Sequence, residues 1–280
     1  MQFLTAGFED SSALFGGKGI ARWLSDWRFQ PNVTPFSYWA WPVGASVMYV
    51  LILFSLRHVM ATRKALEFPR ILFLHNITLC IASLFLGSWL TYTLADAFVN
   101  GLTAYQLVCS RQIYENGHMH MIYYINMFFK VWEFLDTFLL VVRKKQVAFL
   151  HAYHHAATLI LTWNQLMEHS SPQWVPIVIN LWVHVLMYYY YAMSALRIRI
   201  WWKKYLTTLQ ICQFVIDVTI IGYAYFTFIR AGFDDTVCYG TTTGALVGLG
   251  VLFSYLLLFV RFYFQTYSKP RSKESAKKVQ

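Results

Sequence analysis

Seven long apolar segments constrain the fold of this chain more than any other feature. A helix needs about 20 mostly apolar residues to cross the hydrocarbon core of a bilayer. Strands of a membrane barrel would instead be segments of about ten residues with alternating hydrophobicity. The segment lengths therefore predict an all-α polytopic membrane protein with seven transmembrane helices. These cover approximately residues 38–57, 71–94, 119–142, 148–168, 174–193, 205–229 and 241–265.

The composition supports a membrane protein. Of the 280 residues, 58% are hydrophobic and 13% are charged, whereas a soluble domain carries about 25% charged residues. Such a chain is too apolar to be disordered, and four cysteines are too few for a disulfide scaffold. The net charge of +10 would suggest nucleic-acid binding in a soluble protein. In a membrane protein it indicates basic loops on the cytosolic side.

The distribution of basic residues predicts the orientation. Most of the 23 Lys and Arg residues follow the first, third and fifth predicted spans or lie in the C-terminal tail, which places these segments in the cytosol. We therefore expect a single membrane domain over residues 1–280. It has a lumenal N-terminal segment (1–37), seven transmembrane helices (38–265) and a cytosolic basic tail (266–280). Lys277 and Lys278 have the form of a dilysine retrieval signal, which predicts the endoplasmic reticulum membrane.

Two cysteines, Cys109 and Cys238, fall in predicted lumenal loops. An oxidising lumen permits a disulfide between them. The sequence gives no distance between the two residues, so the pairing stays open.

Ionisable residues inside the predicted spans are candidate functional groups, because they are costly to place in a bilayer. Span 119–142 contains Lys130, Glu133, Asp136 and Thr137. Their spacing places them along one helical stripe, where Lys130 and Glu133 can form an ion pair. A purely structural ion pair is the alternative interpretation.

The next two spans carry a second polar group. His151, His154 and His155 share one face of span 148–168, and Asn180 and His184 lie one turn apart in span 174–193. When the rise per residue is counted from the ends of each span, these groups and the ionisable stripe lie at similar depths in the membrane. We therefore expect one cavity that opens to the cytosol.

Two other function classes compete at this point. The spacing His151-x-x-His154-His155 is similar to one histidine box of the membrane di-iron desaturases and hydroxylases, but the remaining histidines form no second box. A non-catalytic seven-helix receptor or transporter would use the polar cluster for binding alone. Bound iron would identify the first class, and turnover of substrate would exclude the second.

Four motifs occur in order between Lys130 and Gln213. Together they resemble those of the ELO family of very-long-chain fatty acid elongases, over the chain from about residue 74 to its end. Trp174-Val175-Pro176 is similar to the fungal-type members, which favour saturated and monounsaturated chains, whereas Gln146 is also found in elongases of polyunsaturated chains. The four motifs are Lys130-x-x-Glu133-x-x-Asp136-Thr137, His151-x-x-His154-His155, Asn180-x-x-x-His184-x-x-Met187-Tyr188-x-Tyr190-Tyr191 and Thr207-x-x-Gln210-x-x-Gln213.

The resemblance implies a fatty acid elongase that condenses a long-chain acyl-CoA with malonyl-CoA, giving a 3-oxoacyl-CoA, CO2 and CoA. It implies that six of the seven helices form an inverted-repeat barrel around an acyl tunnel, with CoA at the cytosolic mouth. No metal or redox cofactor is expected, because decarboxylation of malonyl-CoA supplies the carbanion. The implied partners are acyl-CoA, malonyl-CoA, membrane lipids and the ketoreductase, dehydratase and enoyl reductase of the elongation cycle. The resemblance is also compatible with a homodimer, and it implies no binding of nucleic acid.

The resemblance also assigns roles. His154 is the expected nucleophile, forming an acyl-imidazole in a ping-pong scheme, and His184 is expected to orient the malonyl group or transfer a proton. Tyr223, Tyr225 and Phe226 are candidates for the closed end of the tunnel. Other expected hydrogen-bond donors are His151, His155, Asn180 and Gln213; Lys130, Glu133 and Asp136 are expected to brace the site; the expected CoA-binding cations are Lys144, Lys145, Arg199, Lys203 and Lys204.

Overall fold

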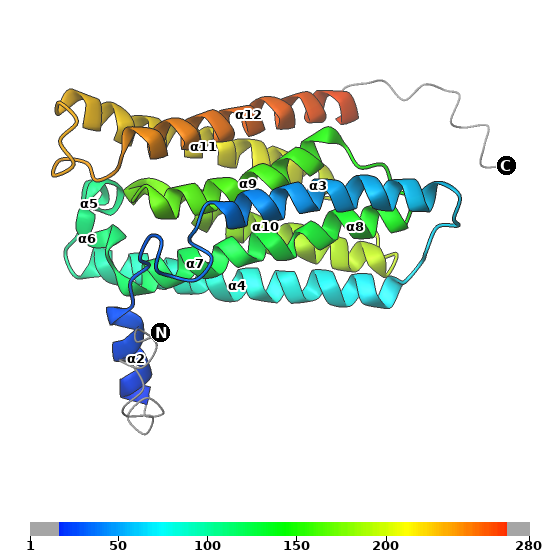
Figure 1. Cartoon of the computed structure of the whole chain (residues 1–280), viewed down its shortest axis with the longest axis horizontal. Helices are drawn as coiled ribbons and strands as arrows, with labels where there is room; N and C mark the ends of the chain where they lie inside the picture. The colour runs from blue at the N-terminus through cyan, green and yellow to red at the C-terminus, as the bar shows by residue number, and fades with distance from the viewer. Residues whose placement is uncertain (1–16, 268–280) are drawn as a thin grey trace.

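The computed structural model describes residues 17–267, so Lys277 and Lys278 lie outside the described residues. Most of the helices run along the long axis of an elongated bundle, and α2 points away from it at one end (Figure 1). Within the described range every regular element is helical. These are α2 (Gly17–Asp26), α3 (Ala40–Ala61), α4 (Pro69–Val99), α5 (Ala104–Cys109), α6 (Arg111–Tyr114), α7 (Gly117–Trp132), α8 (Phe134–Val142), α9 (Phe149–Met167), η1 (Ser171–Gln173), α10 (Trp174–Ala195), α11 (Lys203–Arg230) and α12 (Thr242–Tyr267).

All seven predicted apolar segments are helical, with one interruption. The segment expected as a single helix over 119–142 is divided at Glu133 into α7 and α8. There the backbone N–H of Asp136 donates to the carbonyl of Glu133, three residues back, at 3.1 Å. This bond has the spacing of a 3₁₀ turn, which is tighter than an α-helix. The expectation of one unbroken helix is corrected at this residue.

Five helices in the described part of the chain are long and apolar enough to cross a membrane: α3, α4, α10 with η1, α11 and α12. The break at Glu133 leaves α7 with 16 residues and α8 with 9. Helix α9 has 19 residues and includes the three clustered histidines. The chain is therefore a polytopic membrane protein, and the crossing of the membrane by α7–α8 and by α9 stays a prediction.

Contacts between the long helices follow a closed order. Helix α4 packs on α10, α10 on α11, α11 on α12, α12 on α9, α9 on α7, and α7 on α4, while α3 packs on α8 and α9. Helices α4 and α10 lie close together at Gly87, where an added Cβ would lie 3.4 Å from Cβ of Leu181. Buried apolar side chains, including Leu90, Met127 and Leu159, fill the space between these helices.

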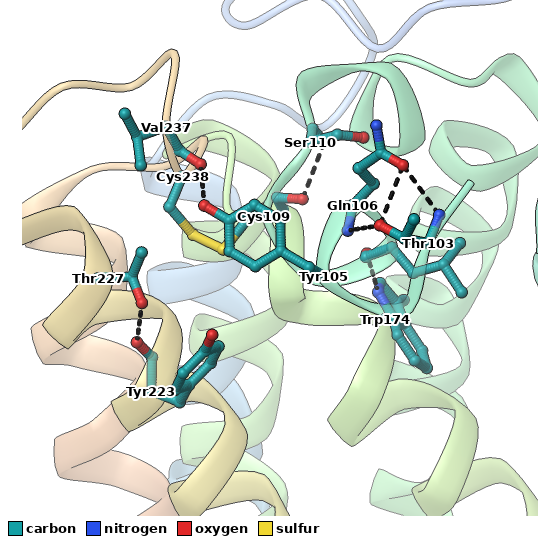
Figure 2. Close-up of a disulfide and its surroundings, with 12 residues drawn as sticks. Thr103, Tyr105, Gln106, Cys109, Ser110, Trp174, Tyr223, Thr227, Val237 and Cys238 are labelled. Carbon is teal, nitrogen blue, oxygen red and sulfur yellow. Dashed lines mark hydrogen bonds between the residues drawn. A yellow bond between two sulfur atoms is a disulfide. The ribbon is translucent and has the colours of Figure 1, made fainter. Parts of the chain in front are cut away.

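A disulfide joins Cys109, at the end of α5, to Cys238, in the loop between α11 and α12. Figure 2 shows Tyr105 beside it, whose hydroxyl donates to the carbonyl of Val237 at 2.6 Å. The backbone N–H of Tyr239 donates to the carbonyl of Cys109 at 2.8 Å. The sequence left this pairing open, and the structure contains it. It ties α5 to the hairpin of α11 and α12.

Candidate active site

The carboxylate of Glu133 is the centre of a buried polar network at the α7–α8 break. Lys130 Nζ donates to Glu133 Oε1 at 2.8 Å, and His184 Nδ1 lies 3.3 Å from the same oxygen. His155 Nδ1 lies 3.8 Å from the other oxygen, Oε2. Lys130 and Glu133 are each only 2% exposed. Breaking a buried pair leaves an uncompensated charge, so removing either member would be costly.

Asn180 connects this ion pair to His184. Its Oδ1 accepts a hydrogen bond from Lys130 Nζ at 3.0 Å, and its Nδ2 lies 3.3 Å from His184 Nε2. Lysine only donates, so the amide oxygen must face Lys130 and the NH₂ group must face the imidazole. His184 Nε2 is then the acceptor, and a neutral His184 carries its proton on Nδ1, toward Glu133. The network thus selects one tautomer of His184.

Asp136 links three helices rather than joining the ion pair. Its Oδ1 accepts from His75 Nε2 of α4 at 2.6 Å, and its Oδ2 accepts from the hydroxyl of Tyr188 on α10 at 2.7 Å. The next residue, Thr137, shares a hydrogen bond of 2.8 Å with the hydroxyl of Tyr49 on α3. Asp136 and Thr137 therefore fix the position of α8 against its neighbours.

His154 lies among aromatic rings from α11 and α12. The centroid of its ring is 4.6 Å from that of Tyr255, 6.2 Å from that of Phe259 and 6.5 Å from that of Phe214. The hydroxyls of Thr158 and Tyr255 both donate to the backbone carbonyl of His154, at 2.5 and 3.2 Å. Two hydrogen bonds thus fix the backbone of His154, and three aromatic rings pack around its imidazole.

A cavity of about 400 Å³ brings the predicted site residues together. Every member of the fourth motif lines it, namely Thr207, Gln210 and Gln213. A second cavity, of about 60 Å³, shares four lining residues with the first and also contacts Lys130. Glu133 lines neither cavity. The other predicted residues that line the larger cavity are Asp136, His151, His154, His155, Asn180, His184 and Lys203.

The cations expected to bind CoA are not all at the cavity. Lys203 lines it, and so does Arg143 at the end of α8, which belongs to the basic run 143–145 expected from the sequence to bind CoA. Lys144 is exposed, and its Nζ donates to the carbonyl of Ala61 at 3.3 Å. Lys204 lies over the ring of Tyr263, 5.6 Å from its centroid. Lys144, Lys145, Arg199 and Lys204 are not among the residues that line the cavity.

Two ionisable residues near the site were not identified from the sequence. His75 binds Asp136, and its distance of 61 residues along the chain hides that contact. Asp217 is 0% exposed and accepts from Gln213 Nε2 at 3.5 Å. Asp217 could have been found, because it is an acid inside a predicted span, four residues after the last residue of a motif.

Two of the three residues expected at the closed end of the tunnel, Tyr223 and Phe226, do not face the interior of the bundle. Tyr223 is 53% exposed and Phe226 is 57% exposed, so both face away from the bundle interior. Tyr225 is half-buried and packs near the disulfide with Phe228. On a helix, residues three apart share a face, and here the outward face carries both Tyr223 and Phe226.

Within residues 17–267, no group of three or more His, Cys, Asp or Glu side chains is arranged to hold a metal ion. His151 and His155 contact each other edge to face, with ring centroids 4.5 Å apart. The nearest carboxylate to His155 is that of Glu133, which also binds Lys130. Among the described residues, His151 Nε2, His154 Nδ1 and His155 Nδ1 are buried and have no hydrogen-bond partner.

Residues 34–275 match the ELO family, described as the GNS1/SUR4 family. A protein of Schizosaccharomyces pombe is 36% identical over 265 residues, which are 91% of this chain and 77% of that protein. Fatty acid elongase A of Dictyostelium discoideum is 34% identical over 250 residues, 89% of this chain and 91% of the relative. Very long chain fatty acid elongase 6 of Rattus norvegicus is 30% identical over 228 residues, 79% and 82% of the two chains.

Proposed function

Because the chain belongs to the ELO family and is a fatty acid elongase, we propose that its cavity condenses a long-chain acyl-CoA with malonyl-CoA. The products are a 3-oxoacyl-CoA, CO2 and free CoA. The observation that carries this proposal is the position of His154. It lines both cavities, packs against aromatic rings of α11 and α12, and shares the lining of the smaller cavity with Lys130 and that of the larger cavity with His184.

The first half-reaction is acyl transfer to His154. A ring nitrogen of the neutral imidazole attacks the thioester carbonyl, an N–C bond forms, the C–S bond breaks, and CoA leaves as the thiol with the imidazole proton. A neutral imidazole is a competent nucleophile. The aromatic walls contributed by Tyr255, Phe214 and Phe259 keep water away from the acyl-imidazole, which would otherwise hydrolyse.

The second half-reaction is decarboxylative condensation. Malonyl-CoA loses CO2, the resulting carbanion attacks the acyl carbon, and a C–C bond forms. The bond to the His154 nitrogen breaks, and the departing imidazole takes up a proton from solvent, which restores the neutral side chain. The negative charge that develops on the thioester oxygen needs donors held in place before the reaction. Asn180, His184 and Gln213 line the cavity and are available for this role. Lys130 and Glu133 act through Asn180 and His184, whose orientation they fix.

The proposal includes the membrane arrangement. Seven helices cross the membrane of the endoplasmic reticulum, with the N-terminus in the lumen and the C-terminus in the cytosol. Six of them form an inverted-repeat barrel around the acyl chain, which the closed order of helix contacts from α4 to α12 and back supports. The disulfide between Cys109 and Cys238 then lies on the oxidising side. The remaining enzymes of the elongation cycle are the proposed partners.

Neither a metal ion nor a redox cofactor takes part in the proposed reaction. The electron pair for the new C–C bond comes from the C–C bond of malonyl-CoA that breaks on loss of CO2. Turnover should therefore continue after dialysis against a chelator. A loss of activity that iron restores would instead support the desaturase or hydroxylase class.

The test is turnover of labelled malonyl-CoA with a panel of acyl-CoAs, using purified protein in detergent. Wild type is expected to form 3-oxoacyl-CoA, and His154→Ala should form none. His58→Ala is the matched control, because His58 is exposed at the end of α3. Incubation with acyl-CoA alone should leave an acyl group on the peptide that contains His154. Folded protein that turns over no acyl-CoA would overturn the proposal and favour a binding protein.

A further inference from the structure

The buried face of α12 ends at a tyrosine beside His154. Residues three and four positions apart share one face of a helix, and the side of α12 that packs on α9 follows this spacing. Small residues at its start let the two helices come close, since an added Cβ at Gly248 would lie 3.3 Å from Gln165 Nε2. Tyr255 is 1% exposed. The buried residues of this face are Gly244, Gly248, Leu252 and Tyr255.

The hydroxyl of Tyr255 meets α9 at two oxygens. It lies 2.9 Å from Thr158 Oγ1 and 3.2 Å from the backbone carbonyl oxygen of His154. Thr158 donates its single hydroxyl proton to the same carbonyl, at 2.5 Å, so the proton of Tyr255 points toward this pair of oxygens. A threonine bonded to the carbonyl four residues back often bends its helix. The backbone at His154 is therefore set by a contact with α12 as well as by α9 itself.

The ring of Tyr255 packs on the imidazole of His154. The two centroids are 4.6 Å apart, closer than those of Phe259 at 6.2 Å and Phe214 at 6.5 Å. Tyr255 lines only the smaller cavity, whereas His154 lines both. Tyr255 thus supports the imidazole on the side of the smaller cavity.

Packing is what holds the imidazole of His154. In the described part of the chain, His154 Nδ1 is buried without a hydrogen-bond partner, and the hydroxyls of Thr158 and Tyr255 reach its backbone. The ring of His184, by contrast, is oriented by Asn180. A reacting group must be held to within about 0.5 Å of its productive geometry. For His154, that restraint has to come from neighbouring rings.

We propose that Tyr255 is a positioning residue for acyl transfer. Its ring holds the imidazole of His154 toward the larger cavity, and its hydroxyl, together with Thr158, fixes the backbone behind that imidazole. Without the ring, the imidazole turns toward the smaller cavity and away from the thioester carbon. This inference rests on the proposed acyl transfer to His154, and it adds a residue of α12 that lies outside the four sequence motifs.

The first test measures the rate at which labelled acyl-CoA acylates His154 in purified Tyr255→Leu. The rate should fall on the order of 10²-fold, as expected when a reacting group is misplaced by about 1 Å. The Kd for an acyl-CoA thioether, which cannot transfer its acyl group, should match wild type. Tyr255→Phe keeps the ring and should react about tenfold faster than Tyr255→Leu. Equal acylation rates in wild type and folded Tyr255→Leu would refute the positioning role.

Tyr123→Leu is the matched control for the loss of a buried tyrosine. Tyr123 is also 1% exposed, and it lines neither cavity. Thermal denaturation in detergent should show a loss of stability in this variant, while the acylation rate stays as in wild type. If Tyr123→Leu slowed acylation as much as Tyr255→Leu, the effect would come from general packing and the inference would be wrong.

A second readout separates position from reactivity. Diethyl pyrocarbonate is a small electrophile that reacts with an imidazole in any orientation. Its reaction at His154, located by mass spectrometry, should be at least as fast in Tyr255→Leu as in wild type. A loss parallel to that of acyl transfer would contradict a role in positioning. Free fatty acid is followed in the acylation assay, because faster hydrolysis alone would show that Tyr255 excludes water instead.

A third variant tests the hydroxyl contact and serves if Tyr255→Leu does not fold. Thr158→Val keeps the shape of the side chain and removes its hydrogen bonds, so acylation should be about threefold to tenfold slower, as for one lost hydrogen bond. Thr219→Val is the control, because exposed Thr219 makes the same kind of bond, to the carbonyl of Val215 at 2.7 Å. Equal rates in the two valine variants would count against the proposal.

These measurements distinguish the positioning role from the proposed function. Wild-type protein that gains no acyl group on His154 counts against acyl transfer itself. Wild-type acylation at a rate that no substitution of Tyr255 or Thr158 changes counts only against the positioning role.

Discussion

Lys130 Nζ lies 3.0 Å from Asn180 Oδ1, although the two residues are 50 positions apart in the chain. This bond allows a cation on α7 to fix the orientation of an amide on α10. The amide in turn presents Nδ2 to His184 Nε2 at 3.3 Å and directs the proton of His184 toward Glu133. The ion pair therefore controls a histidine with which the lysine has no direct hydrogen bond.

Replacing Asn180 should separate the two half-reactions. In Asn180→Leu, His184 loses the group that fixes its tautomer, and the condensation rate should fall about 10²-fold, as when one preorganised donor is removed. Acyl transfer from acyl-CoA to His154 should be affected much less. The measurement is a comparison of acyl-enzyme formation with steady-state turnover of malonyl-CoA.

Asn100→Leu is the control for this comparison, because Asn100 is exposed after the end of α4. Both half-reactions should match wild type in that variant. An equal loss of both rates in Asn180→Leu would contradict the assignment of the network to condensation. Unchanged kinetics would show that the Lys130–Asn180 bond has no part in the reaction.

The two bonds of Asp136 should stabilise the fold. His75→Phe and Tyr188→Phe each remove one hydrogen bond to this carboxylate, and such bonds contribute about 1.5–3 kcal/mol when one partner is charged. Each variant should unfold at a lower temperature in detergent. The double variant should lose less than the sum, because both bonds serve one carboxylate. Tyr189→Phe is the control and should leave stability unchanged, because Tyr189 is 43% exposed. If the losses of His75→Phe and Tyr188→Phe instead added in the double variant, the two contacts would be independent.

Sequence reasoning located the helices well because a bilayer imposes their length and apolarity. It could not place the break at Glu133, which depends on a local hydrogen bond between Glu133 and Asp136. Beyond the three spans expected around one cavity, it also gave no information on which helices are neighbours. The contact of His75 with Asp136 joins α4 to α8, and no sequence pattern around either residue predicts this contact.

The site was predicted as a set of helical faces, and the structure brings those faces together around one cavity. The missed residue Asp217 follows from the same rule that identified Lys130, applied to one more span. The faces of Tyr223 and Phe226 were assigned wrongly because an aromatic residue in a membrane helix can face either lipid or protein. Apolar periodicity distinguishes these two environments poorly when both are apolar.

The disulfide should stabilise the end of the bundle that contains α5. Reduction, or the paired substitution Cys109→Ser and Cys238→Ser, should lower the unfolding temperature, since a disulfide that closes a long loop contributes about 2–4 kcal/mol. Alkylation of the denatured chain should label two of the four cysteines without reductant and all four with it. Cys212→Ser, at an exposed position, should leave stability unchanged. Four labelled thiols without reductant would show that the bridge does not form.

The basic residues that line the cavity, Arg143 and Lys203, should bind the CoA phosphates more strongly than the other cations predicted from the sequence. Arg143→Ala and Lys203→Ala should each raise the KM for both CoA substrates, with a smaller effect on kcat, because phosphate is far from the reacting carbon. Lys144→Ala and Arg199→Ala should have smaller effects, since neither residue lines the cavity. The measurement is the dependence of kcat/KM on salt, which weakens contacts with exposed charges.

The salt dependence of kcat/KM should become less steep in Arg143→Ala and Lys203→Ala and should stay as in wild type in Lys64→Ala. Lys64 is exposed between α3 and α4, so its substitution is the matched control for the loss of one positive charge. A general attraction by net charge would change all variants alike, because each loses the same charge. That result would contradict a phosphate site at Arg143 and Lys203 and favour a role of the basic loops in topology alone.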